Sequence, residues 1–342
     1  MREVSLVLVR FSVFASAGLL FGLVPVSLLV LRPAFAGLSS EGWAEGRARV
    51  ASRLERLVRA ALLATAVATA IGLLLQAILV SEFLPGDIGS SSFSSVFGST
   101  FGRWHLLRFP VLAGLAVLLI GRVQGSLLAG TGDSARSPAP AWWVLWGLFA
   151  FVLLATSTLS GHAAVARPRG VAVVNDVVHL IAGSTWFAGI VVVGAVLPDA
   201  WSRDNGDRAL DLLAPAVVRF SLVALVAIFV LAATGVVNGF LNIATINDLY
   251  DSGYGRSLAL KVLLFLGIVT SGGVNHFFLR DRMRRGALVD AVRARRLFRK
   301  TIAAELAIGM LLFGMTAILV GQARTRQTTA PAPIDVNSSV RV

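Results

Sequence analysis

The sequence predicts an all-α, polytopic membrane protein with eight transmembrane helices in two parallel four-helix halves. Its composition, the spacing of its apolar segments and an internal repeat lead to this fold class. Of its 342 residues, 56% are hydrophobic and only 14% are charged, and the mean hydropathy is +0.80. Soluble domains carry about 25% charged residues, so a soluble fold is excluded.

Apolar segments long enough to cross a bilayer recur along the chain. A membrane-spanning helix needs about 20 mostly apolar residues. Such segments lie near residues 11–31, 57–80, 105–121, 141–160, 174–197, 217–241, 257–279 and 301–321. In the third segment, we expect Arg108 and Pro110 at the start of the helix, where proline is tolerated.

Basic residues concentrate in two linkers, one after the first span and one before the last. They are Arg32, Arg47, Arg49, Arg53, Arg56 and Arg59, and Arg280, Arg282, Arg284, Arg285, Arg293, Arg295, Arg296, Arg299 and Lys300. Because positively charged linkers remain in the cytoplasm, we expect both linkers there and both termini outside, in a protein of the cytoplasmic membrane. Topology thus accounts for the net charge of +13. We expect lipid, and no nucleic acid, as the partner.

An internal repeat relates the first four spans to the last four. The segment STFGR at residues 99–103 matches SGYGR at residues 252–256, and Phe14 of the first span aligns with His179 of the fifth. Also in step are Leu107 with Leu260, Arg108 with Lys261, Gly114 with Gly267, and Ala17, Gly18, Phe21 and Pro33 with Ala182, Gly183, Trp186 and Pro198. An even number of spans separates the halves, so the repeats are parallel. Because phenylalanine replaces His179 in the first half, we expect the chemistry only in the second.

We divide the chain into three parts. Residues 1–140 hold the first three spans and the linker after them, as the body of the first half. Residues 141–321 hold spans four to eight. Residues 322–342 are rich in Thr, Pro, Ala and Ser, a composition typical of a disordered tail.

Histidines and one aspartate form the candidate metal site. Cysteine is absent, which excludes thiolate ligands. We predict that His162, Asp176, His179 and His105 lie near the outer membrane face, with Asp176 and His179 on one helix face because three residues separate them. Imidazole suits copper, zinc, iron and nickel. For His105 or His162 taken alone, a solvated interfacial residue is the better interpretation.

Four further residues are candidates for a pathway through the membrane. They are Asn238, His276, Met310 and Met315. A polar amide could instead bond between helices, His276 could reach the interface beside Arg280, and methionine often only fills space. Trp186 and Tyr254 are supporting candidates. No phosphate loop, Ser/His/Asp triad or zinc-protease helix is present, so we expect no catalytic residues and no enzyme.

Several short motifs together resemble the copper resistance protein D family of inner-membrane proteins. They are Gly161-His162, Asp176 to Ala182 with Trp186 and Gly189, Arg219-Phe220-Ser221, Thr234-Gly235, Tyr254-Gly255-Arg256 with Lys261, and Phe101-Gly102-Arg103. The resemblance implies copper transport, usually import from the outer face. It also implies a CopC-like copper-binding partner, which we expect to be a separate chain.

Two other functions remain open at the level of sequence. A b-type membrane cytochrome would use His105 and His179 to ligate a haem near the outer face. Transmembrane electron transfer would also need a second haem near the inner face, where only His276 is available, so copper is the favoured ligand. A copper-delivery factor that assembles an outer enzyme is the third interpretation.

Overall fold

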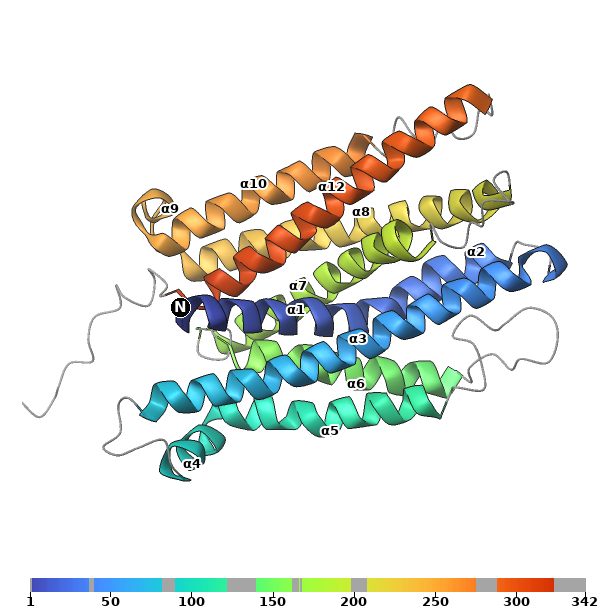
Figure 1. Cartoon of the computed structure of the whole chain (residues 1–342). Coiled ribbons are helices and arrows are strands. Elements are labelled where there is room, and N and C mark those ends of the chain that lie inside the picture. Colours follow the sequence, from blue (N-terminus) through green and yellow to red (C-terminus); the bar gives the residue numbers. More distant parts are fainter. Residues whose placement is uncertain are drawn as a thin grey trace, which may run out of the picture.

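The structure, a computed structural model, describes residues 2–36, 40–81, 90–121, 140–161, 166, 168–197, 208–274 and 288–322. Every regular element in these ranges is helical (Figure 1). The elements are α1 (Arg2–Val26), η1 (Ser27–Leu31), α2 (Arg32–Ala36), α3 (Ser40–Ser81), α4 (Ser90–Gly98), α5 (Thr100–Ile120), α6 (Pro140–Leu159), α7 (Arg169–Val191), η3 (Val192–Val196), α8 (Arg208–Asn242), α9 (Asp248–Asp251), α10 (Gly253–Val274) and α12 (Leu288–Leu319).

Eight of the described helices are long and apolar enough to cross a membrane, which confirms the predicted fold class. The third differs in detail, because it begins at Thr100 rather than near residue 105. Ser99 sets this start, since its Oγ accepts a hydrogen bond of 3.0 Å from the backbone nitrogen of Gly102. Pro110 is therefore inside α5 and not in its first turn. His105 is more than one turn into the helix.

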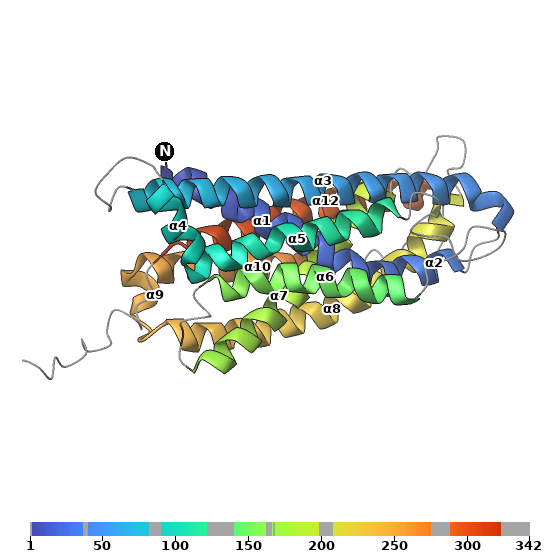
Figure 2. The same cartoon turned by 90° about the horizontal axis from the view of Figure 1, so that it is seen from below.

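The helices repeat their packing in the two halves. In the first half α1 contacts α3 and α5 contacts α6, and in the second half α7 contacts α8 and α10 contacts α12. Helices α1 and α7 pack on each other at the centre. Figure 1 shows α5 and α10 at opposite edges of the bundle, and Figure 2 shows the same for α3 and α8. This is the arrangement expected of two parallel repeats.

Two π-helical segments fall at equivalent places in the repeat. Segment η1 continues α1, and η3 continues α7. Ser27 and Val192, where the two segments begin, are separated by the same number of residues as Phe14 and His179. The caps repeat as well, because Ser252 Oγ accepts from the backbone nitrogen of Gly255 at 2.8 Å, as Ser99 does for Gly102. The two π-helical segments thus support the repeat independently of side-chain similarity, and the caps show that the matched serines have the same structural role.

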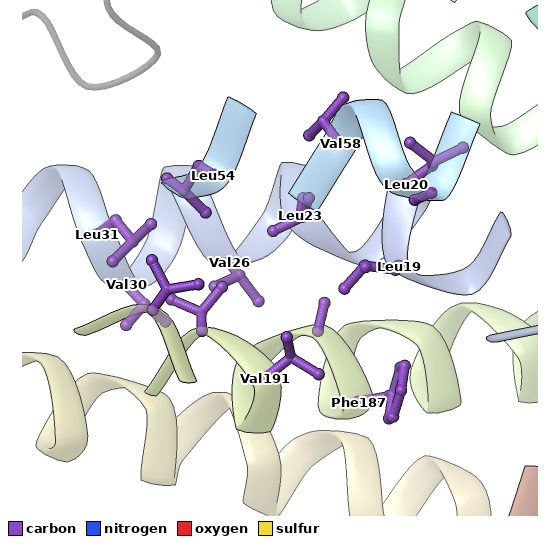
Figure 3. Packing of buried hydrophobic residues seen from close by; sticks show 14 of the residues in the cluster. Leu19, Leu20, Leu23, Val26, Val30, Leu31, Leu54, Val58, Phe187 and Val191 are labelled. Atoms are coloured by element: carbon purple, nitrogen blue, oxygen red, sulfur yellow. The ribbon is translucent and has the colours of Figure 1, made fainter. Parts of the chain in front are cut away.

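The hydrophobic core surrounds the α1–α7 contact. Side chains of α1 fill the space between α3 and α7, among them Leu20 and Leu23 (Figure 3). Gly22 allows the close approach, because an added methyl group would collide with the backbone carbonyl of Ser184 and the side chain of Ala188. The two halves therefore share one core.

Candidate metal site

His179 lies about 15 Å from the start of α7, at ten residues and about 1.5 Å per residue. Its Nδ1 is 2.8 Å from Oγ1 of Thr234 on α8. The Thr234 hydroxyl donates its single hydrogen to the carbonyl of Val230, at 2.6 Å. Oγ1 must therefore accept from His179 Nδ1–H. This assigns the hydrogen to Nδ1 and leaves the lone pair of Nε2 for a metal ion, the arrangement that second-shell partners impose on metal-binding histidines.

Thr234 of α8 forms a second hydrogen bond with α7, through its backbone carbonyl. Asn175 Nδ2 donates to the Thr234 carbonyl at 3.0 Å. Asn175 and His179 are one turn apart, so two side chains of α7 hold one residue of α8. The His179 ring is thereby oriented by a contact between two helices and not by a mobile loop.

Asp176 lies on the same face of α7 and links the halves. Its Oδ2 accepts a hydrogen bond of 2.7 Å from Thr158 Oγ1 at the end of α6. Lys261 of α10 is half-buried and interacts electrostatically with both Asp176 and His179. Three spans of the second half and one of the first thus contribute to this cluster. A carboxylate, an imidazole and an ammonium group are costly to bury within a membrane protein, and this cost makes the cluster a candidate functional site.

His105 lies in the other half of the molecule. Its side chain is 8% exposed, its Nδ1 donates to the Phe101 carbonyl at 2.9 Å, and its ring stacks on that of Phe101 with centroids 3.8 Å apart. Its charged neighbour is Arg108, which donates to Thr156 Oγ1 at 2.8 Å. The hydrogen bonds of His105 and His179 described above thus involve different helices, and the role of His105 as a ligand stays a prediction.

The supporting candidates have distinct positions. The carbonyl of Asn238 accepts from Asn242 Nδ2 at 2.7 Å. Met310 is 39% exposed on the bundle surface, whereas Met315 is partly buried. Trp186 and Tyr254 are buried, at 5% and 9% exposure. Their proposed parts in a pathway stay predictions.

His162 and His276 lie outside the described residues. Within the described ranges, no group of three His, Asp or Glu side chains is close enough together to hold a metal ion. Of the predicted ligands, Asp176, His179 and His105 are described, and only Asp176 and His179 share a helix. His162 follows directly after the described Gly161 in the sequence.

Sequence reasoning missed several residues that make the contacts around His179 and Asp176. The sequence analysis identifies Lys261 only through the repeat and the family resemblance, although an ionisable residue in an apolar span itself indicates a candidate functional position. Thr158 and Asn175 carry no such signal, because polar uncharged residues are common in membrane helices. Only the packing of α6 and α8 against α7 identifies them.

The first half preserves the frame of this site without its histidine. The repeat that aligns Phe14 with His179 also aligns Thr69 with Thr234. Thr69 is fully buried and its Oγ1 has no hydrogen-bond partner among the described residues. The hydroxyl of its counterpart Thr234 accepts the hydrogen bond from His179. The first half has Phe14 at the position of this histidine, so Thr69 has no imidazole to bond.

Comparisons with known proteins match two parts of this chain to one family. The family model "Copper resistance protein D-like, N-terminal domain" matches residues 1–174, and the model "Copper resistance protein D" matches residues 214–319. Copper transport protein CutJ of Bacillus subtilis (strain 168) is 27% identical over 253 residues, which are 74% of this chain and 41% of that protein. The chain thus spans about two fifths of the length of this relative. No solved structure is significantly similar.

Proposed function

Because the chain belongs to the copper resistance protein D family, we propose that it is a multi-pass membrane protein that carries copper ions across the membrane. The family is one of copper handling and not an enzyme class. The related CutJ is itself named a copper transport protein. The proposed capture site consists of His179 and Asp176, with His162 as the third donor and His105 as an auxiliary one.

The observation that carries this proposal is the hydrogen bond between His179 and Thr234. It presents Nε2 as an unprotonated donor, and imidazole nitrogen is a good ligand for copper. Asp176 supplies a negative charge on the same helix face. Lys261 balances that charge while no copper is bound, so the site does not bury an isolated anion.

The proposed direction is uptake from the outer face. The arginine-rich linkers belong in the cytoplasm by the rule for membrane topology, which places the ends of α6 and α10 that carry Thr158 and Lys261 toward the outside. A separate CopC-like protein is the proposed donor of copper at that face.

Replacing His179 with Ala tests the capture site. We expect the copper affinity of the purified protein to fall at least about tenfold, the lower end of the effect of removing a ligand-shell partner. His276→Ala is the matched control, because the sequence predicts His276 at the inner end of the pathway, and the variant should leave outer binding unchanged. Equal copper affinity of the wild type and His179→Ala would reject the site.

A visible spectrum of the same sample separates copper transport from the cytochrome interpretation. The copper proposal requires bound copper without a Soret band. A Soret band that disappears in His179→Ala would assign His179 to haem.

A further inference from the structure

A buried carboxylate in the last span has no part in the capture site. Glu305 of α12 is 5% exposed, and its Oε1 accepts a hydrogen bond of 3.2 Å from Ser271 Oγ of α10. It lies five residues inside the candidate span Lys300–Leu319. An ionised carboxylate at membrane depth is costly and is normally retained for ions or protons that cross the membrane.

Packing connects Glu305 to His179 through one tryptophan. Trp186 follows His179 by two helical turns on α7, so both side chains lie on the same helix face. Its ring packs closely over Gly309 of α12, where an added methyl group would lie 3.3 Å from the ring. Glu305 is one turn from Gly309, toward the end of the bundle opposite the termini. The tryptophan thus lies between two polar clusters on the same side of α7.

The π-helical segment η3 approaches α12 on the other side of Glu305. Gly194 of η3 packs so tightly on Ile302 that an added methyl group would collide with it. Ile302 and Gly309 flank Glu305 along α12. Segments of π-helix occur preferentially at functional sites, so the carboxylate is next to an irregular part of the backbone.

The first half has no equivalent polar pair. The repeat aligns Ser271 with Leu118, whose carbonyl accepts from Trp142 Nε1 at 3.1 Å. The half that lost the histidine therefore also has a hydrophobic residue at the serine position. Both polar clusters occur together in the second half.

We propose that Glu305 and Ser271 form a second cation-binding site for the transported copper ion, on the inner side of Trp186. This inference rests on the proposed transport function. The carboxylate supplies the negative charge and Ser271 orients it by its hydrogen bond. Copper passes from the capture site at His179 around Trp186 to Glu305, and from there to the cytoplasmic side.

Copper transport by vesicles that contain the purified protein tests this second site. Glu305→Gln retains the shape and removes the charge, so the initial rate of copper accumulation should fall at least tenfold. Its copper affinity at the capture site should stay within twofold of the wild type. Glu305→Asp keeps the charge and should retain most of the rate. Glu55→Gln is the matched control, because Glu55 is a carboxylate at the surface of α3 paired with Arg59, and its rate should be unchanged.

Each outcome decides a separate question. Transport by Glu305→Gln at the wild-type rate would overturn the second site and leave the capture site intact. Absence of copper accumulation by the wild type would overturn the proposed function together with this inference. If Glu305→Gln does not fold, Ser271→Ala decides, with a rate reduced severalfold as the expected result and an unchanged rate as the refutation.

Discussion

At the scale of the residue, the hydroxyl of Thr234 determines which nitrogen of His179 can bind a metal. A threonine hydroxyl has one hydrogen, and here the Val230 carbonyl takes it. The oxygen is left to accept from Nδ1–H. A residue that never touches the ion thus sets both the tautomer and the orientation of the ligand ring. Thr69 in the first half has the same backbone position and lacks this role.

Thr234→Val should therefore weaken copper binding by about tenfold, because it removes the acceptor for Nδ1–H and keeps the side-chain shape. The measurement is a competition titration of the purified protein against a copper chelator. Thr69→Val is the matched control at the equivalent position. It should leave copper affinity unchanged, and it should keep or raise stability by up to about 1 kcal/mol, because it removes a buried hydroxyl without a described partner. A weaker copper affinity in Thr69→Val than in Thr234→Val would contradict this assignment.

At the scale of the element, the close contact of α1 and α7 depends on small residues. Gly22 has the backbone of Ser184 directly against its Cα. Close approach through small residues is the usual way for membrane helices to associate, since lipid removes most of the hydrophobic driving force. The consequence is that the central helices tolerate little added volume.

Gly22→Ala should destabilise the protein by about 1–3 kcal/mol, the usual effect of overpacking a filled core. The expected readout is a lower midpoint of thermal unfolding in detergent. Gly239 of α8 serves as the control, because an added methyl group meets nothing within 4 Å there. Gly239→Ala should be neutral or stabilising by up to about 1 kcal/mol through helix propensity. A common midpoint for both variants would show that the α1–α7 contact is looser than described.

The sequence was sufficient to predict the elements but not the partners within the site. Hydropathy is a local property, so the eight spans follow from it directly, and the repeat follows from matching residues such as those of STFGR and SGYGR. Hydropathy predicts the start of α5 too late, near residue 105 instead of Thr100. The cap at Ser99 determines this start, and the apolar residues do not. Glu305 belongs to a span far from His179 in the sequence, and Thr158 belongs to the preceding span, where nothing marks it as the partner of Asp176. Their roles depend on packing between helices, which a single sequence does not encode locally.

At the scale of the whole molecule, the described chain starts and ends at the same end of the bundle. Figure 1 shows the N-terminus, α4 and α9 at one end and α2 at the other. The helix that carries Arg47 and Arg53 starts near α2. Arg47 Nη2 donates to the Phe35 carbonyl at 3.0 Å, and Arg53 Nη1 donates to the Ala195 carbonyl at 3.1 Å. Arginines of α3 therefore contact α2 and the π-helical segment η3 at this end of the bundle.

A reporter fused after Val342 should be active only outside the cytoplasm. The reason is that an even number of spans returns the chain to its starting side, and the basic linkers fix the opposite side in the cytoplasm. Paired fusions of alkaline phosphatase, active outside, and of a fluorescent protein, active inside, make the measurement. Fluorescence from the fusion at Val342 would show that this end lies in the cytoplasm. It would contradict the predicted topology and the proposed direction of uptake.

The contact between α1 and α7 also bears on how such a chain arose. Two equivalent helices that meet at the centre of two equivalent halves have the geometry of a twofold dimer whose subunits became one polypeptide. A symmetric dimer would hold two identical sites, one in each subunit. Fusion frees one copy to change, and here Phe14 marks the copy that did, whereas Thr69 keeps the residue type of Thr234. The joint between the copies, after α6, carries His162, so the covalent link itself supplies a proposed donor to the surviving site.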